Sequence, residues 1–416
     1  MIAVTTLPSG LRIVSEAMPG ARSVSAGFWV GVGARDEWPA LAGASHFLEH
    51  LLFKGTEARS ASSINRAIDA TGGDMNAFTT AEYTAFHARL PEGHLDLALD
   101  VLSDVVWSPA FRPADVEAER SVILEELLAE EDDPDDRVMS LLDEAVFPDH
   151  PLGAEVLGTR ASVEAMEREA IRSFHARWYR PGNVVVAVAG AVDHHEAVAR
   201  LVSRLPELGP AEAPVRRPPE APPRPLLFLR RRSEQAHLAV AVRGLPRGDD
   251  DRHALAVLNQ VLGAGPSSRL FENVREERGL AYTVYSATSA YTDAGALCTY
   301  AGTAPDQAGE VLALLHAELD RLVRDGITED ELAVAAGYLE GSTVLGLEDS
   351  GGRMERIAWS LLTEGHVPPV DDVVGRYSAV TVEDVARVID RLLAGTPRSV
   401  AVVGPMSRRT LEATAA

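Results

Sequence analysis

The sequence predicts an α+β protein built from two structurally similar domains. Three pairs of segments align in the same order in the two halves of the chain, namely 42–55 with 252–265, 111–119 with 327–335 and 183–190 with 398–404. Such self-similarity at long range is the signature of an internal repeat. A stretch rich in proline and poor in apolar residues, 206–225, separates the halves and is typical of an extended linker.

We therefore predict an N-terminal domain over 1–208, a proline-rich linker over 209–225 and a C-terminal repeat domain over 226–416. The chain of 416 residues is long enough for two domains with separate hydrophobic cores.

The elements of the first half follow from hydrophobic periodicity and turn residues. Alternating or continuous apolar runs predict strands at 10–18, 23–35 and 183–192. The segment 72–90 begins with a glycine pair and is then rich in threonine and aromatic residues, which predicts paired strands. Helical periodicity predicts helices at 40–54, 60–71, 91–107 and 113–131.

Composition excludes several classes of protein. The 39 basic and 62 acidic side chains give a formal charge of −23, which argues against nucleic acid or an anionic membrane as a partner. The N-terminus lacks the pattern of a signal peptide, and no apolar run reaches membrane-spanning length. The single cysteine, Cys298, cannot form an internal disulfide or a thiol metal cluster. We expect a soluble, cytoplasmic protein.

The helix predicted at 40–54 carries an unusual group of side chains, His46, Glu49 and His50. Residues four apart project from one face of a helix, so the two imidazoles can share one zinc ion. Glu49 then lies beside the metal and can take a proton from an activated water. The pattern His-x-x-Glu-His is known as the inverzincin motif. Its three fixed positions also leave open that these are ordinary exposed or core histidines.

The second repeat shows that the helix itself needs none of these groups. In the alignment of 42–55 with 252–265, the three positions are Ala256, Asn259 and Gln260. The copy retains the helical pattern but has no ionisable group at these three positions.

A zinc site needs a third protein ligand, and the helix predicted at 113–131 offers candidates. With Ile123 and Leu127 on the buried face, Glu119 and Glu126 share one stripe two turns apart, and Glu125 is rotated about a quarter turn from Glu126. The alternative is an acidic, solvated helix. Spacing alone does not decide between these interpretations.

The chain resembles the pitrilysin family of metallopeptidases, specifically its short-chain branch related to the β-subunit of the mitochondrial processing peptidase. The resemblance covers most of both halves. It rests on five segments in the family's order: HFLEHLLFKGT, GGDMNAFTTAEYTAF, ERSVILEEL, HPLGAEVLGT and SSRLFENVREERGLAYTVYS. It implies that each domain has a mixed, mainly antiparallel sheet flanked by helices, and that the two domains form half of a clamshell.

The resemblance assigns roles that the residues alone leave open. The family's third ligand follows the second histidine by about 76 residues, which selects Glu126 over Glu125. Glu119 matches an acid that supports a ligating histidine. Asn76 and Ala77 match an edge strand that binds substrate by β-augmentation. In the second domain, Arg275 and Tyr282 match a pair that contacts the substrate carbonyl and stabilises the oxyanion.

The implied activity is zinc-dependent endopeptidase cleavage of short or unfolded peptides in an enclosed chamber. One Zn²⁺ per chain would be bound by His46, His50 and Glu126, with Glu49 as general base. Because one chain supplies two domains of a four-domain chamber, we expect a homodimer, with a heterodimer of homologous subunits as the alternative. The rival functions are a non-catalytic scaffold subunit, which predicts eroded zinc ligands, and a processing peptidase dedicated to one peptide.

Overall fold

The computed structural model describes residues 1–206, 211–409 and 411. Residues 207–210, which end the predicted first domain and begin the predicted linker, lie outside the described residues. The chain forms two compact units, and each is described by itself.

The first unit contains a six-stranded sheet of order β1-β2-β6-β3-β5-β4. Only the β2/β6 pair is parallel. Its strands are β1 (Ile2–Thr6), β2 (Arg12–Ala17), β3 (Ser23–Val30), β4 (Asp74–Thr79), β5 (Thr84–Pro91) and β6 (Val184–Gly190). Its helices are α1 (Ala44–Leu52), α2 (Ala61–Asp69), α3 (Leu95–Trp107), α4 (Pro113–Asp132, up to Leu127), α6 (Arg160–Ala165), α7 (Arg168–Trp178), α8 (His194–Val202) and α12 (Ser350–Thr363).

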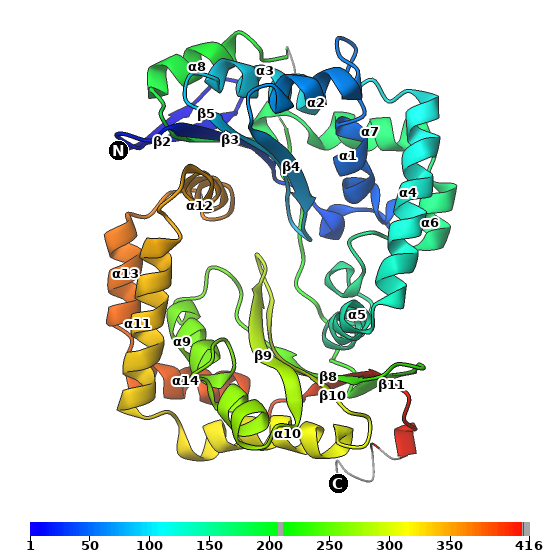
Figure 1. Cartoon of the computed structure of the whole chain (residues 1–416), viewed down its shortest axis with the longest axis vertical. Coiled ribbons are helices and arrows are strands. Elements are labelled where there is room, and N and C mark those ends of the chain that lie inside the picture. Colours follow the sequence, from blue (N-terminus) through cyan, green and yellow to red (C-terminus); the bar gives the residue numbers. More distant parts are fainter. Residues whose placement is uncertain (207–210, 410, 412–416) are drawn as a thin grey trace. The chain divides into compact units, whose positions relative to one another are not determined.

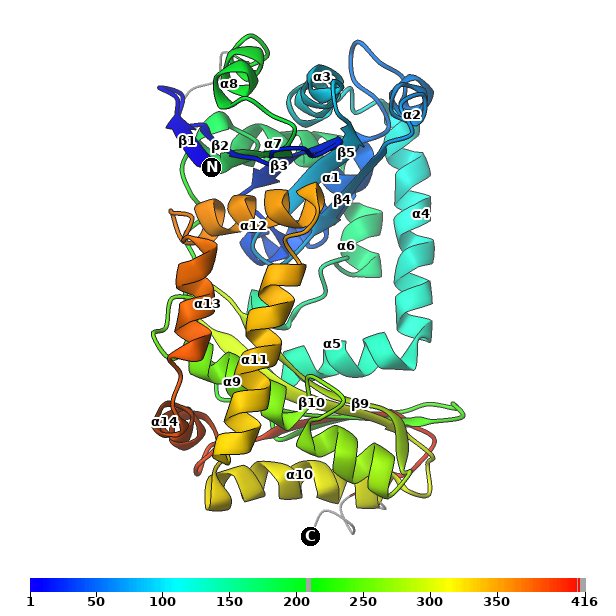
Figure 2. The ribbon, with the colours of Figure 1, turned by 60° about the vertical axis from the view of Figure 1, so that its left-hand side comes forward.

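Both faces of this sheet are buried, which explains its nearly continuous apolar strands. Along β3, Val24, Ala26 and Phe28 join the main core with α1 and α3, whereas Trp29 points to the opposite face. There α12 packs across β2, β3 and β6, on the side of the sheet away from α3 (Figures 1 and 2). The first unit is therefore a sheet between two helical layers.

The second unit contains a five-stranded sheet of order β7-β11-β8-β10-β9. Its strands are β7 (Leu226–Arg230), β8 (Ala236–Arg243), β9 (Ala281–Ala290), β10 (Gly295–Thr303) and β11 (Ser399–Gly404). Its helices are α5 (Pro134–Val146), α9 (Arg252–Leu262), the π-helix η5 (Phe271–Glu277), α10 (Ala308–Asp325), α11 (Glu329–Leu345, up to Thr343), α13 (Val370–Ser378) and α14 (Val382–Leu392). Helix α5 packs on β7, β8 and β11, and α10 lies on the other face (Figure 1).

The two sheets confirm the predicted repeat. The order β2-β6-β3-β5-β4 of the first sheet matches β7-β11-β8-β10-β9 of the second position by position. In each sheet the one parallel pair falls at the same place, β2/β6 and β7/β11. The three aligned sequence pairs correspond to α1 with α9, the start of α4 with the start of α11, and β6 with β11.

The compact units interleave the two halves of the chain. Helix α5, from the first half, belongs to the second unit, and α12, from the second half, belongs to the first unit. Each exchanged helix covers the sheet face that the helices of its new unit leave bare. The domain boundaries 1–208, 209–225 and 226–416 remain a prediction. The compact units differ from these contiguous ranges in the segments that contain α5 and α12.

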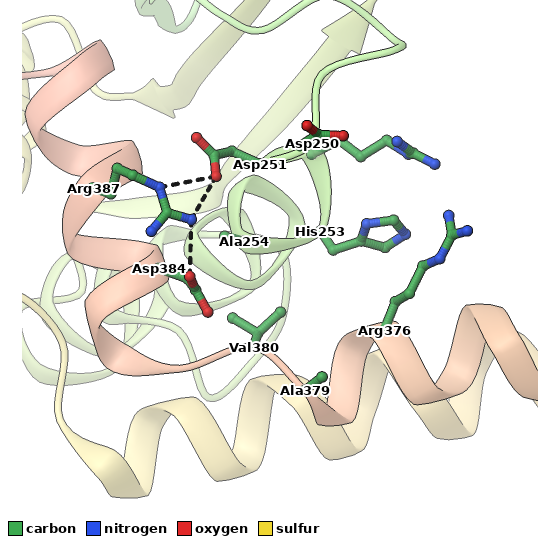
Figure 3. Close-up of a pocket in the computed structure, with 10 residues that line it drawn as sticks. Asp250, Asp251, His253, Ala254, Arg376, Ala379, Val380, Asp384 and Arg387 are labelled. Atoms are coloured by element: carbon green, nitrogen blue, oxygen red, sulfur yellow. Dashed lines mark hydrogen bonds and ion pairs between the residues drawn. The ribbon is translucent and has the colours of Figure 1, made fainter.

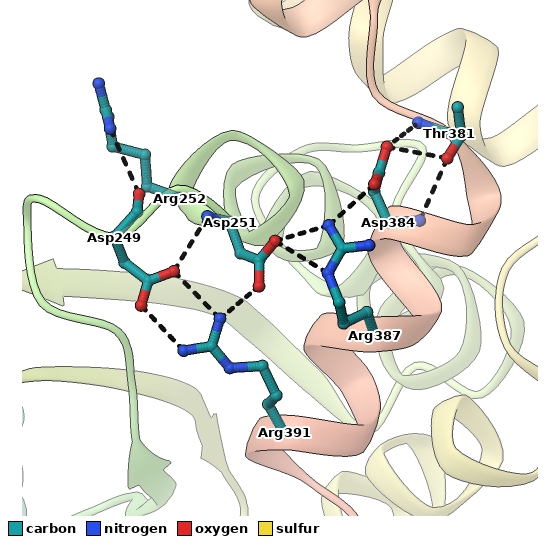
Figure 4. Close-up of polar contacts among 7 residues, drawn as sticks. All are labelled: Asp249, Asp251, Arg252, Thr381, Asp384, Arg387 and Arg391. Carbon is teal, nitrogen blue, oxygen red and sulfur yellow. Dashed lines mark hydrogen bonds and ion pairs between the residues drawn. The ribbon is translucent and has the colours of Figure 1, made fainter.

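Charge pairs tie α14 to the start of α9 in the second unit (Figure 4). Arg387 Nη2 lies 2.6 Å from Asp251 Oδ1, and Arg391 Nη2 lies 2.8 Å from Asp249 Oδ2. Arg387 also pairs with Asp384 on its own helix. These contacts join α14 to the start of α9, two helices of the second unit.

Across the residues that the structure describes, none of the helices combines the length and the apolar character needed to cross a membrane.

A buried histidine makes the stability of the first unit depend on pH. His175 on α7 stacks on Tyr179 and bonds through Nε2 to the carbonyl oxygen of Val106 at 2.9 Å. Burial lowers the pKa of His175 to about 4, against the opposing effect of the Val106 bond. The folded state therefore holds a neutral imidazole at a pH where the unfolded chain already binds a proton.

We predict that the His175→Gln variant loses less stability than the wild type between about pH 6.5 and about pH 4. A lowered histidine pKa gives stability that is present above the unfolded value of 6.5 and is lost as pH falls toward 4. The shift corresponds to about 3 kcal/mol at most. Urea unfolding of both proteins across this range measures the difference. Parallel curves for the two proteins would show that His175 is not the titrating group.

Candidate metal centre and active site

The start of α1 is fixed by contacts that set the direction of the whole helix. The carboxylate of Glu37 accepts hydrogen bonds from the backbone amides of Gly43 and Ser45, both at 2.6 Å. Gly43 has a φ of +92°, and a Cβ there would lie 2.5 Å from the carbonyl oxygen of Leu157. Gly158 is equally constrained, because a Cβ there would meet the carbonyl oxygen of Ala42 at 2.3 Å. Only glycine fits either position.

From this start, α1 presents His46 and His50 on one face, with ring centroids 4.7 Å apart. Glu126 reaches both rings from α4. Its Oε2 lies 3.7 Å from His46 Nε2 and 3.5 Å from His50 Nε2. Potential ligand atoms of the three residues all lie within 4.8 Å of one another. Within the described part of the chain, this is the one group of three or more such side chains with that spacing.

A second layer of charged groups holds His50. Its Nδ1 lies 3.1 Å from Glu119 Oε2, and the other oxygen of Glu119 lies 2.6 Å from Lys54 Nζ. The Glu119 side chain is only 5% exposed. If the Nδ1–H of His50 donates to Glu119, Nε2 keeps its lone pair and points at the cluster. Lys54 balances the buried charge of Glu119.

His46 is kept neutral by its surroundings. Burial, and to a lesser degree the neighbouring His50, lower the pKa of His46 to about 4. Its Nδ1 is buried and has no hydrogen-bond partner among the residues that the structure describes. A neutral imidazole is the form that binds a metal ion.

These residues fit a zinc ion. Zinc sites of hydrolytic enzymes use three protein ligands from histidine and carboxylate, each about 2.0–2.2 Å from the metal, so the ligand atoms lie roughly 3–4 Å apart. The two distances to Glu126 Oε2, 3.7 and 3.5 Å, lie in that range. The imidazole nitrogens of His46 and His50 and the carboxylate oxygen of Glu126 are all donor types found on zinc in proteins. Their role as ligands remains a prediction.

Glu49 lies on the same helix and is tied down on one side. Its Oε2 accepts a hydrogen bond from the hydroxyl of Thr79 at 2.7 Å. Burial raises the pKa of Glu49, while the Thr79 bond and His50 oppose the rise. The carboxylate is thus held in one orientation beside the two histidines.

The structure places Asn76 and Ala77 on β4, which forms an edge of the first sheet. Ala77 is buried, and its backbone N–H donates to Asn76 Oδ1 at 2.9 Å. The edge predicted from the sequence is therefore present. The roles of Asn76 and Ala77 in binding substrate remain predictions.

Arg275 and Tyr282 lie together in the second unit. Arg275 Nη1 donates to the carbonyl oxygen of Tyr282 at 2.9 Å, and its guanidinium stacks over the Tyr282 ring at 4.7 Å. It also contacts the ring of Phe271 at 4.6 Å. Tyr282 is 77% exposed, so its side chain is available to a ligand. Arg275 lies on the π-helix η5, a rare winding that is frequent at functional sites.

A surface pocket of about 500 Å³ in the second unit lacks comparable chemistry. It lies beside α9, α13 and α14, with His253 and Arg376 on one side and Asp251, Asp384 and Arg387 on the other (Figure 3). Arg387 pairs with both of these carboxylates. The ion pair with Asp251 joins α14 to the start of α9, two of the helices that form the walls of the pocket.

Two residues of the site were not singled out from the sequence, Lys54 and Thr79. Lys54 lies in the segment HFLEHLLFKGT and Thr79 in GGDMNAFTTAEYTAF. Their place in these two segments was the one indication in the sequence that they belong to the site. A lysine at a helix end and a threonine in a strand are ordinary residues until their partners are known.

The chain belongs to the insulinase family of peptidases, peptidase family M16. Residues 12–160 match the family described as insulinase (peptidase family M16), and residues 165–337 match the family described as peptidase M16 inactive domain. The predicted membership of the pitrilysin-type family is thereby confirmed. The more specific likeness to the processing peptidase β-subunit remains a prediction.

Curated relatives cover nearly the whole chain. A protein of Streptomyces coelicolor is 47% identical over 97% of this chain and 89% of its own length. A Bacillus subtilis protein is 38% identical over 92% of this chain and 94% of its own. Both are named as uncharacterized zinc proteases.

Solved structures share the fold. A protease from Helicobacter pylori superposes with a TM-score of 0.89 at 22% identity, over 97% of this chain and 99% of its own. A peptidase M16 inactive domain from Pseudomonas fluorescens superposes with a TM-score of 0.90 at 21% identity, over 98% of each chain. The predicted α+β fold with two similar sheet-and-helix domains is confirmed.

We predict that metal-free protein takes up one zinc ion per chain and that Glu126→Gln weakens this binding by more than about 100-fold. A neutral amide replaces an anionic ligand, which costs more than the 10–100-fold typical of an outer-layer change such as Glu119→Gln. Titration with a competing zinc chelator measures the affinities. Glu125→Gln is the matched control, because Glu125 is also exposed and lies next to Glu126 on the same helix. If Glu125→Gln lost zinc and Glu126→Gln retained it, the ligand assignment would be wrong.

Proposed function

We propose that the chain is a zinc-dependent endopeptidase that cleaves short or unfolded peptides, with Glu49 as general base. One observation carries the proposal. His46, His50 and Glu126 bring potential ligand atoms within 4.8 Å of one another, and the carboxylate of Glu49 lies on the same helix as both imidazoles. The family and the names of the relatives support the same activity. A scaffold subunit would not need to retain this set.

The residues divide the chemistry between them. His46, His50 and Glu126 would hold the zinc ion, which would supply the Lewis acidity that activates water near neutral pH and polarises the peptide carbonyl. Glu49 takes the proton of the attacking water and returns it to the leaving amine. Glu119 holds the His50 ring so that Nε2 faces Glu126 and would be free to bind the ion.

The edge strand β4 is the proposed substrate-binding element. An extended peptide would add to its free edge as a further antiparallel strand. In this proposal, a substrate carbonyl replaces Asn76 Oδ1 as acceptor for the N–H of Ala77, and the freed Asn76 amide donates to the substrate backbone. Strand addition fits unfolded peptides, since a folded protein offers few unpaired strands.

The pair Arg275 and Tyr282 is proposed to stabilise the oxyanion formed on the substrate carbonyl. The chain is proposed to work as a homodimer in which the pair of one chain serves the zinc site of its mate. A heterodimer with a homologous subunit is the alternative. A cytoplasmic location and the choice between general peptide turnover and one dedicated peptide substrate remain predictions.

We predict that Glu49→Gln retains zinc but loses turnover by about 10²–10⁴-fold or more. Glutamine keeps the size and the hydrogen bond to Thr79 but cannot accept a proton from water. Hydrolysis of internally quenched peptides measures turnover, and elemental analysis measures zinc in the same sample. Full activity in this variant, or full activity of the wild type after complete removal of metal, would contradict the mechanism.

We predict that mixing inactive Glu49→Gln with inactive Tyr282→Phe protein restores activity if the site is completed between chains. Each site would combine Glu49 of one chain with Tyr282 of its mate, so exchange of subunits forms heterodimers with one doubly defective site and one intact site. The oxyanion donor must lie within ~3 Å of the developing charge. Exchange is followed by native mass spectrometry of differently tagged chains. Demonstrated exchange without recovery of activity would show that the pair does not act across the dimer.

A further inference from the structure

Thr79 ends the edge strand β4 and faces the helix that carries the proposed zinc ligands. Side chains alternate across a strand. Met75 and Ala77 pack into the core that contains α1, and Phe78 packs on the opposite face against Trp29. Thr79 follows the same alternation, so its hydroxyl points to the side of α1 and donates to Glu49 Oε2 at 2.7 Å.

The backbone of Thr79 belongs to the free edge of the same strand. Among the described strands, β4 pairs with β5 on one side and has no strand partner on the other. The N–H of Ala77 bonds to the Asn76 side chain, so it faces away from β5. Because backbone groups alternate in direction along a strand, the N–H and C=O of Thr79, two residues further on, face the same edge as those of Ala77.

Glu49 is bound to Thr79 through one carboxylate oxygen only. Oε2 accepts the hydroxyl proton at a length typical of a charge-assisted O–H···O⁻ bond. Oε1 makes no hydrogen bond to the residues that the structure describes. The hydroxyl therefore fixes the carboxylate and leaves one oxygen for a water molecule.

We propose that Thr79 is a positioning residue that holds the bound peptide and the general base in one register. Its backbone is one of the groups to which a substrate strand adds, and its hydroxyl orients Glu49. A peptide that pairs correctly with β4 is thus aligned with a carboxylate attached to the same residue. This inference rests on the proposed peptidase function and adds to it the link between strand addition and proton transfer.

A purely structural role for the hydroxyl predicts a different result. A hydrogen bond that only stabilised the β4–β5 hairpin would contribute to folding. Its loss would then change kcat and KM together. A positioning role acts on the chemical step, since misorientation of a base lowers kcat while the strand edge still binds peptide.

The kinetic test compares Thr79→Val, Thr79→Ser and Thr363→Val on a quenched peptide that the wild type cleaves. Valine keeps the branched shape and removes the donor, so we expect kcat to fall about 10- to 100-fold with KM within about threefold and zinc content unchanged. Serine keeps the donor and should keep kcat within about threefold of the wild type. Thr363 is the matched control, because it is also half-buried and, among the residues that the structure describes, its hydroxyl bonds only to the carbonyl oxygen of Trp359. An unchanged kcat in Thr79→Val, a loss through KM alone, or an equal loss in Thr79→Ser overturns the proposal.

A second test needs no activity. The melting temperatures of metal-free wild type, Thr79→Val, Glu49→Ala and the double variant form a double-mutant cycle. We expect Thr79→Val to lower the melting temperature in the wild-type background and to have little further effect once Glu49 is alanine. Additive shifts overturn the link between the two residues. An inactive wild-type enzyme that still shows the coupling would instead overturn the peptidase proposal, so the two failures are distinguishable.

Discussion

The direction of helix α1 is the constraint on which the site depends. Successive residues of a helix are rotated by about 100°, so a helix that entered one residue out of register would turn both imidazoles away from Glu126. The carboxylate of Glu37 on two amides of the first turn, and the glycines at 43 and 158, remove that freedom. The His50–Glu119 and Glu49–Thr79 bonds then follow from the same placement. The segment HPLGAEVLGT thereby gains a physical role, because its last glycine backs the start of the helix.

The sequence alone predicted the features that depend on the periodicity of apolar residues and on the similarity between the two halves of the chain. Four helices and the β4–β5 strand pair lie close to their predicted ranges, since apolar spacing reports which face is buried. The repeat was informative in a second way. Helix α9 has Ala256, Asn259 and Gln260 where α1 has its ionisable groups, and the two sheets still share one strand order. The histidines of α1 are therefore not a requirement of the fold.

The remaining features depend on contacts between residues that are far apart in the sequence. Such contacts produce no periodic pattern of apolar residues from which they could be predicted. Glu125 and Glu126 are adjacent and acidic, and only the arrangement of α4 beside α1 separates them. Lys54 and Thr79 became noticeable through partners 65 and 30 residues away, Glu119 and Glu49. The apolar faces of α5 and α12 predict that each helix is buried but not that each covers the sheet of the other half. The π-helix of η5 likewise resembles an ordinary helical turn in sequence.

Because α5 and α12 are exchanged between the halves of the chain, we expect that neither half folds stably when it is expressed alone. A fragment ending before the proline-rich segment would carry α5 without the sheet that it covers. It would also expose the sheet face on which Val14, Trp29 and Val185 pack against α12, an apolar patch of the kind that causes aggregation. A single proteolytic cut within 211–225 has the opposite consequence. Each piece would still bury one helix against the sheet of the other, as in a domain-swapped pair, so the nicked protein should remain assembled until it is denatured.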